Sequence, residues 1–218
     1  MIGRSTKSSV PRYLAETYWW AYLHEDSPTV FDHPAVVNTI LWGQYDKLVE
    51  RTLKHTSDAR KLLQASCAYG NVSPKLARQV QQNKGHFDMV DVSPTQLAVA
   101  QRKLAHLDNV RMLQHDVTQD WRHACEAGLS EAGSYDACVL FFLLHELPRA
   151  QKTQALEQML QTVRPDGGKL ICVDFHPPHW WHPLRPVEAA VFHTLEPFAN
   201  DLWQHPMASF LPHHIDPN

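Results

Sequence analysis

The sequence predicts an α/β fold in which a mainly parallel sheet carries helices on both faces. Short apolar runs alternate with amphipathic, capped segments over residues 58–176, as expected when crossover helices join parallel strands. One run, residues 137–144, is almost wholly apolar, which is typical of a central strand buried on both faces. Asp91 ends another run 21 positions after Gly70, a spacing typical of nucleotide-binding βαβ units.

Five strands are expected in this core, at residues 61–65, 87–91, 110–113, 137–144 and 169–173. Ser73 and Pro74 favour an N-cap and a first helical residue after the first strand. Ser93 opens a capping box for the helix after the second strand. A further helix is expected over residues 150–163, and the Pro-Asp-Gly-Gly sequence at 165–168 ends it.

The core is flanked by two segments of different composition. Residues 1–57 begin with a basic tail, expected to be disordered or a remnant of a targeting segment. Two helices, over residues 13–23 and 35–54, are expected to follow it. Residues 177–218 hold a loop rich in proline, histidine and tryptophan and an expected helix over residues 187–203. The chain therefore divides into residues 1–57, 58–176 and 177–218.

Charge and cysteine content narrow the classes of partner. Twenty basic and 23 acidic residues give a net charge of −3 without blocks of like charge, so nucleic acid is not expected. Four cysteines without CxxC spacing indicate buried thiols in a reducing compartment rather than disulfides or zinc ligands. Apolar runs fall short of the roughly 20 residues that cross a bilayer.

Polar and ionisable residues follow the expected strands, at the edge where ligands bind on such sheets. They include Ser66, Tyr69, Gly70, Asp91, Asp116, His145, Glu146, Asp174 and His176. Asp91 is interpreted as a ribose acceptor or, alternatively, as a turn residue. Asp116 is interpreted as an adenine contact or a loop cap. His145 and Glu146 are interpreted as catalytic or metal-binding, or else as structural.

Residues 60–175 resemble class I S-adenosylmethionine-dependent methyltransferases. The likeness rests on Asp91, on Asp116 and on the segments 141–148 and 163–168. It implies a Rossmann-like fold with cofactor contacts from Gln64, Ser66, Ala68, Gly70, Asp91, Val92, Asp116 and Phe141. The first motif departs from the family pattern, because Gln64 replaces its acid, and Ser66 and Ala68 replace two of its glycines. The family's final strands six and seven have no counterpart after Trp203.

A narrower resemblance covers residues 10–212. The segments 11–14, 18–22, 181–186, 195–199 and 201–203 are similar to the rhodoquinone-biosynthesis family of RquA-type proteins. This resemblance implies replacement of a methoxy group of ubiquinone by an amino group, with S-adenosylmethionine as amino donor and manganese assisting. Tyr69, His145 and Glu146 are the expected catalytic residues. Glu146, Asp174 and His176, with His145, are the expected metal ligands.

A polyisoprenoid substrate implies contact with a membrane surface. The aromatic clusters are either the core of the two caps or a lipophilic slot, with Trp180, Trp181 and Trp203 near the membrane. The expected location is peripheral, on the cytoplasmic side of a bacterial inner membrane or in a mitochondrial matrix. Two other functions stay open: a conventional methyltransferase acting on a quinone or another small molecule, and a non-catalytic quinone-binding scaffold.

The broken first motif suggests a hypothesis about the amine of the cofactor. An amine that attacks a quinone carbon must be neutral, because an ammonium group has no lone pair. A carboxylate nearby favours the charged form, whereas the amide of Gln64 can orient the amine without stabilising its proton. Tyr69 either closes over this end of the cofactor or simply packs there. Drift in a motif that no longer matters is the alternative explanation.

Overall fold

The structure is a computed structural model that describes residues 2–4, 10–18, 31–176, 181, 194 and 196–212. Six parallel strands form one sheet in the order β1-β4-β3-β2-β5-β6. They are β1 (Ile2–Arg4), β2 (Lys61–Ala65), β3 (His86–Asp91), β4 (Val110–Gln114), β5 (Ala137–Phe141) and β6 (Lys169–Val173). The sheet is parallel throughout and lies between helices, so the predicted α/β fold class is confirmed.

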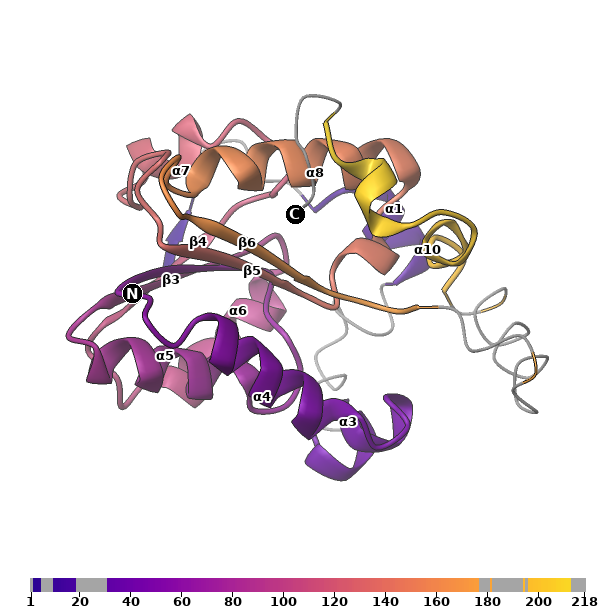
Figure 1. The fold of residues 1–218 in the computed structure, drawn as a ribbon, viewed down its shortest axis with the longest axis horizontal. Coiled ribbons are helices and arrows are strands. Elements are labelled where there is room, and N and C mark those ends of the chain that lie inside the picture. Colours follow the sequence, from indigo (N-terminus) through magenta and orange to yellow (C-terminus); the bar gives the residue numbers. More distant parts are fainter. Residues whose placement is uncertain are drawn as a thin grey trace.

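Helices cover both faces of the sheet (Figure 1). One face carries α4 (Tyr45–His55), α5 (Val72–Gln82) and α6 (Pro94–Leu104), and the other carries α7 (Arg122–Glu126) and α8 (Arg149–Thr162). Shorter elements are α1 (Arg12–Thr17), α3 (Pro34–Ile40), the 3-10 turns η2 (Leu144–Glu146) and η3 (Met207–Phe210), and α10 (Asn200–Gln204). The core therefore consists of two apolar layers separated by the sheet.

Local sequence explains several element boundaries. Ser93 caps α6, since its hydroxyl accepts the N–H of Gln96 at 3.3 Å, with Pro94 in the first turn. Gly85 precedes β3 where a Cβ would lie 2.1 Å from the carbonyl oxygen of Arg60, so only glycine fits. Every residue of β5 is buried, as predicted for a central strand.

Four predicted boundaries are wrong. The N-terminal tail contributes β1, whose backbone pairs with Met112–Gln114, because pairing at a sheet edge needs no apolar pattern. Ser73, the expected N-cap, lies inside α5, which begins at Val72 after Asn71. The helix expected over residues 35–54 is split into α3 and α4 by left-handed backbone at Trp42 (φ 51°) and Gly43 (φ 71°). The apolar run 137–144 leaves the sheet after Phe141 because Phe142 has φ 55°.

The structure describes only part of the two segments that flank the core. Helix α1 ends at Thr17, and residues 19–23 of that expected helix lie outside the described residues. Of the helix expected over residues 187–203, α10 covers 200–204, and residues 187–193 lie outside the described part. Trp180 and most of the loop 177–186 also lie outside it. Among the described residues, no strand follows β6. None of the described helices has the length and apolar character needed to cross a membrane.

Candidate functional site

Asp91 closes a turn at the carboxyl end of β2. Its Oδ2 accepts the backbone N–H of Cys67 at 2.6 Å, and its Oδ1 accepts the N–H of Ser93 at 2.7 Å. Burial raises the pKa of Asp91 to about 6, although the backbone N–H groups act in the opposite direction. The carboxyl group therefore fixes two neighbouring loops and still has lone pairs for further donors.

The turn that follows β2 has unsatisfied acceptors. Ser66 has φ 92°, left-handed backbone at a position where the family motif has glycine. Gln64 is fully buried, and its Nε2 donates to the carbonyl of Ser66 at 2.9 Å. Within the described part of the chain, Gln64 Oε1 and Ser66 Oγ are buried without hydrogen-bond partners. Gln64 thus supports the turn from behind instead of lining the cavity described below.

Tyr45 anchors the rest of the turn from α4. Its hydroxyl accepts the N–H groups of Asn71 at 2.7 Å and Val72 at 3.0 Å. A Cβ on Gly70, which has φ 83°, would lie 2.4 Å from that hydroxyl. The backbone N–H of Gly70 donates to Asp32 at 2.7 Å. The surviving glycine of the motif is therefore required by packing and by backbone conformation.

Tyr69 contacts helix α6 and Phe31. Its hydroxyl accepts from Nε2 of Gln96 at 2.8 Å, and its ring lies 5.9 Å from that of Phe31. Burial raises its pKa. Together with Ala68 it lines a small space beside Asp32.

A cavity of about 50 Å³ lies over the turn at the strand ends. Of the predicted cofactor residues it is lined by Ser66, Asp91, Val92 and Asp116, whereas Gln64, Ala68, Gly70 and Phe141 do not line it. Its other lining residues include Tyr13, Leu14, Cys67, Ser93, Gln96, His115 and Glu146. Asp116 also caps its own loop, accepting the N–H and the hydroxyl of Thr118 at 2.9 and 2.8 Å.

Helix α1 covers this cavity through Tyr13 and Leu14. A ligand of cofactor size occupies several hundred Å³, so a cavity of about 50 Å³ does not admit it unless the cover moves. Tyr13 and Tyr18 both contact the ring of Phe198, with centroids 6.3 and 6.2 Å away. The cover is therefore held by the C-terminal segment.

His145 forms a second centre at the ends of β5 and β6. Its Nδ1 lies 2.9 Å from Oδ1 of Asp174, and Asp174 also accepts the N–H groups of Leu144 (2.7 Å), His145 (3.2 Å) and Phe175 (2.8 Å). Both side chains are almost fully buried, at 5% and 1% exposed. Asp174 thus fixes both the η2 turn and the imidazole ring.

The other ring nitrogen of His145 faces two carboxylates. Nε2 lies 3.8 Å from Glu146 and 3.9 Å from Glu196. Burial by itself lowers the pKa of His145, but the carboxylates of Asp174, Glu196 and Glu146 outweigh it and raise the pKa to about 9. His145 is therefore an imidazolium at neutral pH. Burial raises the pKa of Glu196, whose carboxylate also contacts the hydroxyl of Tyr18.

The predicted manganese ligands do not assemble. Within residues 31–176 and the other described ranges, no group of three or more His, Cys, Asp or Glu side chains is placed to hold a metal. Both oxygens of Asp174 are occupied by hydrogen-bond donors, Glu146 faces the cavity, and His176 lies in a separate groove. The side chains that the structure describes therefore do not form a metal centre.

Tyr13, Gln96 and Glu196 belong to the site but are not among the residues predicted from the sequence. Gln96 follows Asp91 by five positions in the capping-box segment, a local signal that could have identified it. Tyr13 and Glu196 carry no such signal, because they reach the site from segments outside the βαβ core.

The matches to known proteins concern the core. Residues 62–167 match the model of a family described as methyltransferase domain. No curated protein sequence matches the chain significantly.

Solved structures share the fold at low identity. The N-methyltransferase NodS from Bradyrhizobium japonicum, in complex with S-adenosyl-L-homocysteine, has 21% identity and a TM-score of 0.51. The match covers 68% of this chain and 66% of the NodS chain, so this chain spans just under two thirds of the length of NodS. A SAM-dependent methyltransferase from Aquifex aeolicus has 18% identity over 80% and 87% of the two chains, with a TM-score of 0.51. Human N-acetylserotonin methyltransferase in complex with SAM has 16% identity over 85% and 51%, with a TM-score of 0.55.

Proposed function

We propose that this chain, with its class I methyltransferase fold, binds S-adenosylmethionine at the carboxyl ends of its strands and transfers a group from it. The proposal rests on the surroundings of Asp91, which we call the Asp91 corner. There the buried carboxylate of Asp91 accepts backbone N–H groups from the turn after β2 and from Ser93, and it also lines the cavity. Ligands of doubly wound sheets bind there, with an acid after the second strand holding the ribose. The match to a methyltransferase domain supports the same cofactor.

The residues present fit this cofactor. Asp91 would accept the ribose hydroxyls, and Ser66 and Asp116 would lie against the rest of the nucleoside. The buried, unpartnered Ser66 Oγ is an acceptor that a bound ligand can satisfy. Bound S-adenosylmethionine supplies the group that is transferred. Helix α1 then excludes water by placing Tyr13 and Leu14 over the cavity.

The reaction that we favour replaces a methoxy group of ubiquinone by an amino group, with the cofactor as amino donor. The sequence resemblance supports this choice, and so does a first motif in which Gln64 replaces the usual acid. A departing methoxide needs a proton, and the imidazolium of His145 lies beside Glu146, which lines the cavity. Asp174 holds the proton-bearing ring in place.

Conventional methyl transfer to a quinone or another small molecule is the second candidate. The match of residues 62–167 to a methyltransferase domain favours it. A non-catalytic quinone-binding scaffold is the third possibility, and the retained Asp91 and His145–Glu146 argue against it.

One incubation separates the three functions. The protein is mixed with ubiquinone and S-adenosylmethionine, with and without manganese, and the quinone mass is measured. Exchange of methoxy for amino is the expected product, and nitrogen-15 in the amino group of the cofactor should appear in it. A gained methyl group would assign methyl transfer, and an unchanged quinone that still binds would assign a scaffold.

We also propose peripheral contact with a membrane, on the cytoplasmic side of an inner membrane or in a mitochondrial matrix. Large apolar side chains are exposed at Ile40 (48%), Trp42 (56%) and Trp181 (63%), and aromatic residues favour the membrane interface. Replacing Trp42 and Trp181 by serine should reduce sedimentation with liposomes. Gln204→Ser, also at an exposed position, is the control and should bind liposomes like the wild type.

A further inference from the structure

Lys152 is a charged side chain in the interior of the protein that the proposed reaction does not use. It belongs to α8, and its side chain is fully buried. A buried ammonium group costs free energy unless acceptors surround it. Its Nζ donates to the carbonyl oxygens of Leu147 at 2.6 Å and Phe198 at 2.7 Å, and it lies 3.3 Å from Oδ2 of Asp201. Lys152 therefore joins α8 both to the end of η2 and to the C-terminal segment.

The contact with Phe198 connects Lys152 to the cover of the cofactor cavity. The backbone carbonyl of Phe198 accepts from Lys152, and the ring of Phe198 contacts the rings of Tyr13 and Tyr18. Tyr13 in turn lines the cavity beside Asp91. We call residues 12–18 and 196–210 together the lid. Phe198 is thus the residue through which α8 holds the part of the lid that lies over the cavity.

The other polar contacts of the lid are longer or more exposed. The hydroxyl of Tyr18 donates to the carbonyl of His145 at 3.5 Å. Glu196 lies 3.9 Å from Nε2 of His145 and is 21% exposed. Hydrogen bonds from a charged donor are roughly twice as strong as those between neutral groups. The two short bonds from the buried ammonium of Lys152 are therefore the main polar hold on the lid.

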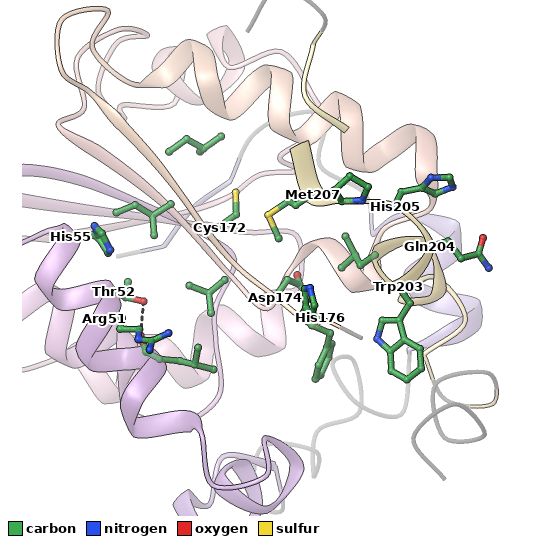
Figure 2. A pocket seen from close by; sticks show the side chains of 17 residues that line it. Arg51, Thr52, His55, Cys172, Asp174, His176, Trp203, Gln204, His205 and Met207 are labelled. Atoms are coloured by element: carbon green, nitrogen blue, oxygen red, sulfur yellow. Dashed lines mark hydrogen bonds between the residues drawn. The ribbon is translucent and has the colours of Figure 1, made fainter. Parts of the chain in front are cut away.

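Open space lies on one side of the C-terminal part of the lid. Leu202 and Phe210 pack against the core, but a groove of about 740 Å³ separates this part from α4. Figure 2 shows Arg51 and His55 of α4 along one wall of the groove and residues 203–207 along the other. Segments with few buried apolar contacts open at the lowest cost in free energy. The lid therefore has both a weakly packed side and room to move.

The size of the cavity requires such a movement. A cavity of about 50 Å³ is far smaller than a ligand of cofactor size, so the cofactor enters and leaves only while the lid is displaced. We propose that the lid opens for cofactor exchange and that Lys152 is the positioning residue that holds it closed. This inference rests on the proposed function, because it concerns the cofactor of that reaction.

The test compares two lid variants with a control on the same helix. Lys152→Met keeps an unbranched side chain and removes the donor for the carbonyls of Leu147 and Phe198. Phe198→Leu removes the ring that Tyr13 and Tyr18 contact. Gln154→Met, at an exposed position of α8, is the control. Association and dissociation of isotope-labelled S-adenosylhomocysteine are measured by rapid filtration, and backbone hydrogen exchange is measured by mass spectrometry.

We expect Lys152→Met to raise both the association and the dissociation rate constant at least tenfold. The Kd should change less than threefold, because Lys152 holds the lid in the empty and in the occupied protein, so that its loss affects both states alike. Phe198→Leu should act in the same direction by a smaller factor. Amides of residues 12–18 should exchange faster in both variants, whereas those of β3 and β5 should exchange as in the wild type.

The control Gln154→Met should match the wild type in every measurement. Circular dichroism and the melting temperature show whether Lys152→Met is folded, and Phe198→Leu provides the test if it is not.

Two results would overturn the lid assignment. One is wild-type rate constants together with wild-type exchange of residues 12–18 in the folded variants. The other is faster dissociation with an unchanged association rate constant, which would mean that Lys152 supports the bound site and not an opening lid. Absence of S-adenosylhomocysteine binding by the wild type would instead contradict the proposed function, and hydrogen exchange of residues 12–18 would then decide the lid assignment by itself.

Discussion

Asp91 is the last residue of β3 and Asp174 directly follows β6, yet the protein holds the two carboxylates differently. Asp91 accepts backbone N–H groups from Cys67 and Ser93, and no cationic side chain pairs with it in the described part of the chain. Asp174 accepts three backbone N–H groups and pairs with the imidazole of His145. The two carboxylates therefore have different roles. Asp91 is suited to binding a neutral hydroxyl group of a ligand, whereas Asp174 is suited to holding a charged side chain.

Removing Asp174 should have the largest effect. Asp174→Ala leaves the buried imidazolium of His145 without its main partner, and loss of one member of a buried pair costs about 3–5 kcal/mol. We expect the free energy of unfolding, measured in urea at pH 7, to fall by that amount. Asp166→Ala, at an exposed turn position, is the control. A loss below about 1 kcal/mol would show that the His145–Asp174 contact is incidental.

The same pair should be visible in the pH dependence of stability. The pKa of His145 is raised from 6.5 to about 9, so the stabilisation is complete below pH 6.5 and is lost as pH rises to about 9. Urea titrations of the wild type from pH 6 to pH 9.5 should show this decline. In Asp174→Ala the decline should shrink, and an identical slope would assign it to another group.

Removing the charge of Asp91 should affect the ligand more than the fold. Asp91→Asn should weaken S-adenosylmethionine binding by about 1.5–3 kcal/mol, the range for hydrogen bonds to a charged group. Calorimetry at pH 7.5 measures this change. Unchanged affinity would remove Asp91 from the cofactor site, and Asp136→Asn, at the opposite end of the sheet, should bind like the wild type.

The raised pKa of Asp91 gives stability and cofactor affinity opposite dependences on pH. Its pKa of about 6 lies above the ordinary 3.8, so its contribution to stability falls as pH rises from about 4 to 6. Cofactor affinity should rise as pH increases from about 4 to 7, because the carboxylate of Asp91 is a better acceptor for hydroxyl groups than its protonated form. Asp91→Asn should abolish this rise, and a rise that persists would belong to another group.

Gln64→Glu should have a smaller effect, on rate. Gln64 lies behind the Ser66 turn, where a carboxylate would raise the pKa of a nearby amine. Each unit of that increase lowers the neutral fraction about tenfold near neutrality. We expect cofactor binding to be retained and the amination profile to move to higher pH. Gln64→Met, which removes the amide without adding charge, is the control. Full activity with an unmoved profile would contradict the hypothesis.

Removing Glu196 should have the smallest effect. It lies 3.9 Å from Nε2 of His145 and is 21% exposed, and partly exposed pairs are worth about 0.2–1 kcal/mol. Glu196→Gln should lower the free energy of unfolding within that range and leave the decline above pH 6.5 largely in place. A loss as large as that of Asp174→Ala would mean that both carboxylates hold His145 equally.

The Asp91 corner was predictable because its signals are local. The strand pattern places Asp91 at the end of β3, and Ser93 and Pro94 place the helix that follows. Gly70 is marked in the sequence by its motif, and the clash with Tyr45 explains it. The assignment of Gln64, Ala68, Gly70 and Phe141 to the cofactor wall came from the resemblance alone, and these four residues do not line the cavity.

The sequence by itself determined the parallel sheet, its central strand and the position of Asp91, because alternation, capping residues and turn residues act over a few positions. Only the tertiary structure decided that Asp174 orients His145, that Glu196 reaches the same ring and that Tyr13 covers the cavity. These contacts join segments that are 29, 51 and 78 positions apart (Asp174–His145, Glu196–His145 and Tyr13–Asp91). Their pairing depends on how the layers pack, which periodicity along the chain does not encode.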